Sequence, residues 1–225
     1  MASARDDAKR AAARAALAEL PERGIVGIGT GTTAKWFIEA LADVRERYRV
    51  VATSQASRAL AASLGLALLG DDGPWDIAVT VDGADEVDDE LQLIKGGGGA
   101  HAREKIVNAS SRRNVIVVDD SKRSRRLGER RAVPVEVLRF GHGATAARLG
   151  AFGAAALRVV DGAPFATDAG NVIYDIACGP IEDPRALDAA LHAIPGVVET
   201  GLFVDRADVV LVASATGVER LTRGS

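Results

Sequence analysis

Residues 77–85 read Ile77-Ala78-Val79-Thr80-Val81-Asp82-Gly83-Ala84-Asp85. The first five residues form a continuous run of apolar and β-branched side chains, which predicts a buried strand. This strand delivers Asp82 at its carboxyl end, followed by a glycine and two further acids, Asp85 and Glu86. A buried strand that ends in carboxylates is typical of a site in an open α/β sheet.

Similar strands lie on both sides of this stretch, and helical patterns separate them. We expect strands at 25–28, 50–53 and 114–118, and helices at 5–19, 33–47, 57–64 and 103–110. Strands that alternate with helices predict an α/β fold with a doubly wound, mostly parallel (Rossmann-like) sheet. Polar loops follow the strands at 29–33, 53–57, 82–85 and 119–122, where such sheets bind ligands.

The pattern changes after Pro134. We expect strands at 135–138, 155–160, 172–177 and 202–203, helices at 143–149 and 184–193, and a final strand at 208–213. Asp183 is expected to cap the helix that begins at Pro184. The sequence therefore predicts a catalytic α/β domain at 1–130 plus 204–225, and a smaller α+β insert at 131–203, with the last strand returning to the main sheet.

The composition excludes several classes of protein. Of 225 residues, 48% are hydrophobic and 26% are charged, which is ordinary for a globular chain with a full core. The net charge of −3 argues against a nucleic-acid surface. No apolar run is long enough to cross a bilayer, and the single cysteine excludes an internal disulfide. We expect a cytoplasmic protein without nucleic-acid or membrane partners.

The segment from Lys95 through Gly96, Gly97, Gly98 and Gly99 is the strongest sign of chemistry. Consecutive glycines weaken helices and strands, but they let a backbone approach a ligand closely. A flexible linker is the alternative, although apolar residues precede the run and a helix follows it. Carboxylates and a lysine beside such a loop are groups that move protons and stabilise an oxyanion. Glu104, near the start of that helix, suits the helix dipole and is also compatible with an ordinary first-turn acid.

A second glycine-rich segment runs from Gly27 to Thr33 between a strand and a helix. Backbone N–H groups at a helix start, together with threonine hydroxyls, suit a phosphate. The spacing matches neither the dinucleotide-binding pattern nor the P-loop, and a simple turn capped by Thr32 or Thr33 is also compatible with it. The hydroxyls of Thr53–Ser57 are accounted for by helix capping alone.

The acids after the strand allow two interpretations. Asp82, Asp85, Glu86 and Asp88 are hard-cation ligands, but a solvated acidic turn has the same composition. Asp82 is the one that we expect to be functional. Glu86, Asp88 and Asp89 are expected at the surface.

The three histidines and the cysteine carry weaker signals. His101 lies beside the glycine run and is a candidate substrate contact, whereas His142 and His192 show no metal-ligand spacing and are assigned to the core or the surface. Cys178 is expected to be buried and inert, with no base nearby in the sequence.

Taken together, these motifs resemble those of ribose-5-phosphate isomerase of the A type, over nearly the whole chain and in order. The resemblance rests on 27–33 (Gly-Ile-Gly-Thr-Gly-Thr-Thr), 82–86 (Asp-Gly-Ala-Asp-Glu), 95–100 (Lys-Gly-Gly-Gly-Gly-Ala), 103–106 (Arg-Glu-Lys-Ile), 120–122 (Asp-Ser-Lys), 134–137 (Pro-Val-Glu-Val), 168–171 (Asp-Ala-Gly-Asn) and 194–203 (Ile-Pro-Gly-Val-Val-Glu-Thr-Gly-Leu-Phe). Two positions depart from it: Thr32 stands where serine is common, and His101 where an aliphatic residue is frequent.

The resemblance implies an isomerase that interconverts ribose 5-phosphate and ribulose 5-phosphate in the non-oxidative pentose phosphate pathway, without metal or organic cofactor. It implies Glu104 as the catalytic base, with Asp82, Asp85 and Lys95 as the other catalytic residues. The implied substrate contacts are Lys9, Thr30, Gly31, Thr32, Thr33, Asp82, Gly83, Ala84, Asp85, Lys95, Gly96, Gly97, Gly98 and Lys122. The implied state is a homodimer or a tetramer.

Two other functions remain compatible with parts of the pattern. A non-catalytic sugar-phosphate sensor would keep the phosphate loop but would not need the acids and Lys95. A sugar-phosphate lactonase or amino-sugar deaminase would leave the glycine run without a role.

Overall fold

The computed structural model describes residues 4–223 and divides them into two compact units. Unit 1 contains the described residues up to Ala84, then Arg103–Lys122 and the residues from Arg206 onward. Unit 2 contains Asp85–Ala102 and Arg123–Asp205. Unit 2 thus holds the expected insert, 131–203, together with 85–102, 123–130 and 204–205.

Unit 1 is built on a seven-stranded sheet. Every neighbouring pair is parallel except β15 (Val209–Ser214) and β16 (Gly217–Thr222), which are antiparallel. This confirms the doubly wound, mostly parallel sheet and the return of the chain through β15. Across the sheet the strands are β16 (Gly217–Thr222), β15 (Val209–Ser214), β7 (Asn114–Asp119), β4 (Ile77–Asp82), β1 (Gly24–Ile28), β2 (Tyr48–Ala52) and β3 (Ala67–Leu68).

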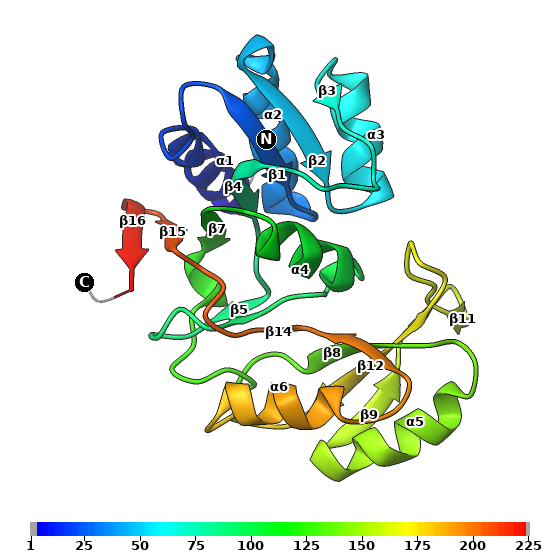
Figure 1. The fold of residues 1–225 in the computed structure, drawn as a ribbon. Coiled ribbons are helices and arrows are strands. Elements are labelled where there is room, and N and C mark those ends of the chain that lie inside the picture. Colours follow the sequence, from blue (N-terminus) through cyan, green and yellow to red (C-terminus); the bar gives the residue numbers. More distant parts are fainter. Residues whose placement is uncertain (1–3, 224–225) are drawn as a thin grey trace. The chain divides into compact units, whose positions relative to one another are not determined.

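Helices cover both faces of this sheet. Alternate strand residues such as Val26 and Val50 share a core with α1 (Ala4–Leu17), α2 (Thr32–Ala42) and α3 (Gln55–Ser63), which are blue to cyan in Figure 1. On the other face, Val51 and Ile77 pack against Val107 of α4 (His101–Ala109). This division follows from the period of two in a strand, which points successive side chains to opposite faces.

The second helix differs from its prediction at both ends. Helix α2 begins at Thr32 after an N-cap at Gly31, whose φ is 107°, and no side chain caps it. The expected threonine cap is therefore wrong, because a glycine makes the left-handed turn instead. The helix ends at Ala42, and Arg45–Arg47 form a separate 3₁₀ turn, η1, so the expected end at 47 was too late.

No described helix is long and apolar enough to cross a membrane.

The strand order identifies the edge of the sheet at which a ligand is expected. Strand β1 lies between β2 and β4, so the chain moves outward to β2 and β3 and then returns to the other side of β1. The carboxyl ends of β1 and β4 therefore flank the point where the order reverses, which is where open α/β sheets bind ligands. The 29–33 loop and Asp82 lie at these two ends.

Unit 2 contains an antiparallel sheet with the order β13 (Val197–Thr200), β8 (Val133–Val137), β12 (Val172–Ala177) and β9 (Ala154–Leu157). Helices α5 (His142–Leu149) and α6 (Pro184–His192) share its core, and both lie along one side of it in Figure 1. Asp183 caps α6 by accepting the N–H of Ala186, as predicted. Short elements complete the unit: β5 (Glu86–Val87), β6 (Leu93–Ile94), β10 (Val159–Val160), β11 (Ala163–Pro164), β14 (Leu202–Phe203), and the 3₁₀ turn η3 (Gly150–Phe152).

The single strand expected at 155–160 is interrupted. Strand β9 ends at Leu157, and β10 pairs with β11 as a separate two-stranded hairpin. Arg158 stands between them, and its backbone joins the two parts by donating to Ile173 O and accepting from the N–H of Phe165.

Candidate functional site

Asp82 joins the ends of two central strands in unit 1. Its buried Oδ1 accepts the N–H of Thr30 at 3.1 Å and the N–H of Gly83 at 2.7 Å. Thr30 follows β1 and Asp82 ends β4, so this carboxylate ties together the two strand ends at the reversal of strand order. Of the predicted site residues, Thr30, Asp82 and Gly83 are thus brought into contact, and Ala84 is the last residue of this segment in unit 1.

Gly29 makes this contact possible. A Cβ at position 29 would lie 1.9 Å from Oδ1 of Asp82 and 2.7 Å from its Cα. No side chain fits there, so the glycine is required by the close approach of the carboxylate rather than by a positive φ.

The loop between β1 and α2 is stabilised by hydroxyl groups. The Thr30 hydroxyl donates to Ser54 Oγ at 2.8 Å and lies 2.9 Å from Thr53 Oγ1, while Ser57 donates to Gly29 O at 2.6 Å. Ser54 also caps α3, as predicted for this group of hydroxyls. The Thr30 side chain is thus used inside the loop. The first N–H groups of a helix have no partner within that helix, so those at the start of α2 suit an anion.

Glu104 is buried, with 4% of its surface exposed, in the first turn of α4. The helix lies close to β1 because residue 27 is a glycine: a Cβ there would come within 2.8 Å of Val107 Cγ1 and 2.0 Å of Thr80 Oγ1. Glu104 is one turn before Val107, on the side of the helix start. A carboxylate at this position is stabilised by the positive end of the helix dipole.

An ion-pair network fixes the same turn of α4. Arg103 donates to Asp71 Oδ2 at 2.7 Å, and Arg58 binds the other oxygen of Asp71. Burial would raise the pKa of Asp71, but hydrogen bonds from Arg58 and Arg103 outweigh it and lower the pKa. The residue next to Glu104 is therefore held to the loop after β3.

The two predicted phosphate lysines, Lys122 and Lys9, both belong to unit 1. Lys122 is in η2 (Asp120–Lys122), directly after the carboxyl end of β7. Lys9 precedes Arg10, whose guanidinium carbon lies 4.0 Å from the centre of the Trp36 ring. Because Trp36 is in the N-terminal half of α2, this contact places that part of α1 near the helix end that follows the 29–33 loop.

The glycine loop belongs to unit 2 and is held by its backbone. The N–H of Gly97 donates to Asp85 Oδ2 at 2.7 Å, and the N–H of Gly99 donates to Gly96 O at 2.9 Å. Within residues 4–223, the N–H groups of Gly96 and Gly98 make no hydrogen bond. A Cβ on Gly97 would lie 2.7 Å from Asp85 Oδ1, so the contact with Asp85 also requires a glycine.

Lys95 is buried at the start of this loop. Its N–H donates to Gly201 O at 2.8 Å, and its ammonium lies 5.3 Å from the centre of the Phe203 ring. A cation over an aromatic face is attracted by the ring quadrupole. The structure therefore places the Lys95 side chain in the interior of unit 2, with its charge over the Phe203 ring.

Glu86 is not at the surface, and this prediction is wrong. It is fully buried, and its two oxygens accept the N–H groups of Gly128 and Arg130 at 3.0 and 3.2 Å. Asp88 is half-buried, and burial raises its pKa although the N–H groups of Gln92 and Glu90 lower it. Asp89 is exposed, as expected. All four acids that suggested a metal cluster thus accept hydrogen bonds from backbone N–H groups.

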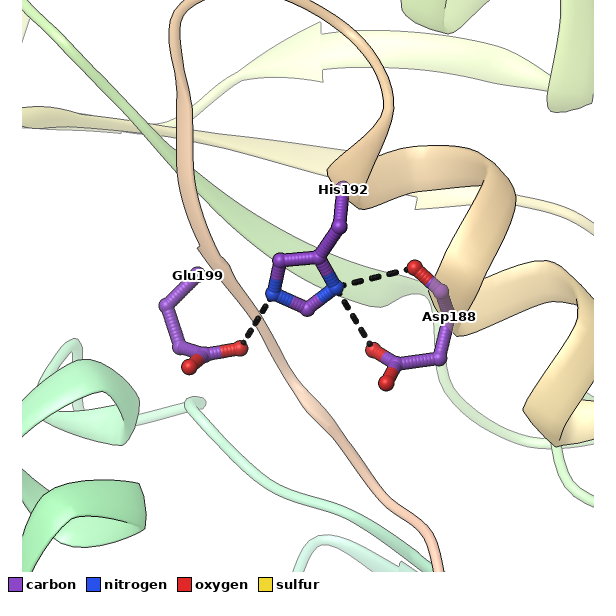
Figure 2. A group of neighbouring side chains, drawn as sticks. All are labelled: Asp188, His192 and Glu199. Atoms are coloured by element: carbon purple, nitrogen blue, oxygen red, sulfur yellow. Dashed lines mark hydrogen bonds and ion pairs between the residues drawn. The ribbon is translucent and has the colours of Figure 1, made fainter.

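Figure 2 shows a cluster that no sequence motif predicted. His192 Nε2 lies 2.8 Å from Glu199 Oε1, and Nδ1 lies 2.9 Å from Asp188 O and 3.3 Å from Asp188 Oδ1. In residues 4–223 this is the one group of three ligand-type side chains close enough to share a metal ion. Oxygen atoms already contact both ring nitrogens, so the cluster links α6 to β13 without an ion. The spacing of four between Asp188 and His192 was the available signal.

The remaining candidates are structural. His101 is fully buried, and its Nε2 lies 3.3 Å from Glu199 O. His142 Nδ1 lies 2.7 Å from the Tyr174 hydroxyl. Cys178 is half-buried, and burial raises the pKa of its thiol, which favours the unreactive protonated form.

Comparison with known proteins gives a consistent result. The sequence profile of the family "Ribose 5-phosphate isomerase A (phosphoriboisomerase A)" matches residues 49–217. Proteins named "Ribose-5-phosphate isomerase A" from Caulobacter sp. (strain K31) and Korarchaeum cryptofilum are 47% and 42% identical to this chain. The matches cover 96% of this chain in both cases, and 98% and 97% of those proteins.

Solved structures agree. Ribose 5-phosphate isomerase A from Methanocaldococcus jannaschii has a TM-score of 0.91 and 36% identity, over 96% of this chain and 99% of that one. A D-ribose-5-phosphate isomerase in complex with phospho-erythronic acid has a TM-score of 0.93 and 36% identity, over 97% of this chain and 99% of that one.

Proposed function

The chain belongs to the ribose 5-phosphate isomerase A family, and from this premise we propose how its own residues interconvert ribose 5-phosphate and ribulose 5-phosphate. The proposal rests on one observation: Thr30, Asp82 and the helix that bears Glu104 are held near the carboxyl ends of β1 and β4. This edge of the sheet suits a small anionic ligand. A relative solved in complex with phospho-erythronic acid supports this mechanism, because the carboxylate of that ligand resembles an enediolate.

Glu104 serves as the base. It removes the proton from C2 of the open-chain aldose, and the electrons form a C1–C2 double bond while O1 takes the negative charge. Glu104 then returns the proton to C1 as the O2 proton leaves and C2 becomes the carbonyl. A single carboxylate serves both steps because the enediolate is planar, so a base on one face of it can reach both C1 and C2. Asp82 relays the proton between the sugar oxygens and assists ring opening.

The oxyanion needs donors that are in place before the charge develops. We assign this role to the Lys95 ammonium and the N–H groups of Gly96 and Gly98. The N–H of Gly97 donates to Asp85, so we assign this N–H the role of fixing the loop. Asp85 therefore positions the loop and binds a sugar hydroxyl.

Chain continuity supports the action of both groups of residues on one substrate. Asp85 follows Asp82 by three residues, which span at most about 11 Å. The glycine loop leads directly into α4, which carries Glu104. The catalytic residues of the two units are thus tethered by short segments.

The overall activity is tested by following ribulose 5-phosphate formation from ribose 5-phosphate, with and without EDTA. We expect conversion that EDTA does not change, since Glu104 and Lys95 supply the base and the positive charge. Binding of ribose 5-phosphate without conversion would support a sensor instead. Loss of activity with EDTA would show that a metal takes part.

The phosphate is bound by the start of α2 and by Lys122 and Lys9, which supplies binding energy remote from the reacting carbons. Replacing Lys122 with alanine should raise KM by about tenfold, because one charge-assisted contact to the phosphate is lost. The value of kcat should change little. Steady-state kinetics measure both constants. An effect confined to kcat would contradict a phosphate contact.

We also propose self-association as a homodimer or tetramer. Phe140 is 96% exposed, and the apolar side chains of Leu138, just after β8, and Val198, in the neighbouring β13, are exposed as well. Exposed aromatic and aliphatic side chains gathered together mark interaction surfaces. Light scattering on the purified chain measures its mass, and a monomer at micromolar concentration would refute the proposal.

The proposed location is the cytoplasm. A phosphorylated sugar is charged and does not cross a bilayer unaided, so its isomerase must share its compartment. Cell fractionation tests this, and recovery of the protein outside the cytoplasm would contradict it.

A further inference from the structure

Arg158 binds the carbonyl groups of the glycine loop. Its Nη1 donates to Gly96 O at 2.7 Å and to Gly97 O at 3.3 Å. Its Nε donates to Asp175 Oδ2 at 2.9 Å, and its Nη2 binds Asp175 Oδ1. The fork of the guanidinium thus grips a carboxylate with one edge and two loop carbonyls with the other, a geometry that lysine cannot reproduce.

Each carbonyl that Arg158 binds shares its peptide group with the N–H of the next glycine in the loop. The carbonyl of Gly96 shares a rigid peptide plane with the N–H of Gly97, which donates to Asp85. The carbonyl of Gly97 shares a plane with the N–H of Gly98, an assigned oxyanion donor. A cation on the carbonyl side therefore sets the orientation of these N–H groups and strengthens them as donors, because linked hydrogen bonds polarise one another.

Hydrogen bonds hold the exposed part of the loop, Gly97 and Gly98, whereas Gly96 is buried and a Cβ on it would lie 2.7 Å from His101 Nδ1. Asp85, Gly97, Arg158 and Asp175 line a cavity of about 240 Å³ in unit 2. Packing resumes only at Gly99, where a Cβ would lie 2.3 Å from the Phe165 ring. Without the guanidinium, the peptide group between Gly97 and Gly98 would lose its fixed orientation beside this cavity, because both residues are exposed.

We propose that Arg158, oriented by Asp175, is a positioning residue for isomerisation that presets the Gly98 N–H for the oxyanion and the Gly97 N–H for Asp85. This inference rests on the proposed role of the glycine loop. The position gives no motif signal in the sequence, since Arg158 is 62 residues from Gly96.

The test compares R158Q and R158K with R126Q, which removes an exposed arginine from another ion pair of unit 2, with Glu182. For R158Q we expect kcat for ribose 5-phosphate to fall about 10–100-fold with KM nearly unchanged, because small misplacements of catalytic groups cost this much. R158K should lie between R158Q and the wild type. R126Q should match the wild type. A wild-type kcat in folded R158Q would overturn the proposal.

Hydrogen exchange gives a second readout that does not depend on turnover. We expect faster exchange confined to the amides of residues 96–99 in R158Q, and a smaller increase in D175N, which keeps the arginine but weakens its anchor. Unchanged loop exchange in both variants would overturn the proposal. If R158Q does not fold, R158K and D175N carry the test.

The kcat values of R158Q and Glu104→Gln separate the positioning role of Arg158 from the role of Glu104 as the base. If R158Q keeps full kcat while Glu104→Gln is inactive, the mechanism stands and only the positioning role is wrong. If Glu104→Gln keeps full kcat, the assignment of the base is wrong whatever R158Q shows.

Discussion

Replacing Glu104 with glutamine should lower kcat by about 10²–10⁴-fold, the usual contribution of a general base. The amide is nearly the same size as the carboxyl group, so the buried site in α4 keeps its packing while losing the group that accepts the C2 proton. Since this interaction is made in the transition state, KM should change little. Steady-state kinetics with ribose 5-phosphate measure both constants.

Glu90→Gln is a suitable control because it makes the same chemical change at an exposed acid of unit 2. It should leave kcat and the melting temperature unchanged. Solvent-proton exchange into the product adds a direct test, since Glu104→Gln should abolish exchange at C2 together with turnover. Near-normal turnover in Glu104→Gln would exclude this residue as the base.

Replacing Gly29 with alanine should reduce both stability and activity. The new Cβ would lie 1.9 Å from Asp82 Oδ1, so the carboxylate or the loop must move. Overpacking of this kind costs about 1–3 kcal/mol of unfolding free energy. The displaced Asp82 would also lose its hydrogen bond from Thr30, and kcat should fall by about 10²-fold. Denaturant unfolding and kinetics on the same preparation measure the two effects.

Gly143→Ala is the matched control. Gly143 lies in α5, and a Cβ there would meet no atom within 4 Å. Because alanine favours helix over glycine, this variant should be as stable as the wild type or more stable by up to about 1 kcal/mol. Wild-type stability and kcat in Gly29→Ala would show that the contact between Gly29 and Asp82 is not needed.

Five of the seven strands in the unit 1 sheet were predictable because each carries its own signal. A strand buried on both faces of a parallel sheet is a continuous apolar run, as at 77–81 and 114–118, and its partners need not be known. Two-residue strands such as β5 and β6 carry no such signal, since periodicity cannot be read from two residues. The edge strand β16 was missed because none of its residues is fully buried and it has no continuous apolar run.

The candidate site was partly predictable for the same reason. Asp82 and the 29–33 loop follow strong strands, and four consecutive glycines weaken any helix or strand, so they indicate a loop whose backbone is approached closely. The burial of Glu86 could not be predicted, because the N–H groups that it accepts come from Gly128 and Arg130, more than 40 residues later. An isolated acid in a turn has the same local sequence whether it faces water or a backbone.

The amino-acid sequence was sufficient to predict the buried central strands of unit 1 and the acids, lysines and glycines that follow them. These properties depend on side-chain hydrophobicity and on neighbours a few residues away. The three-dimensional structure was needed to show which oxygen each N–H binds, that Gly29 has no room for a Cβ, and that Arg158 and Asp175 hold the glycine loop. Such contacts join residues far apart along the chain, so they leave no periodic or local pattern in the sequence.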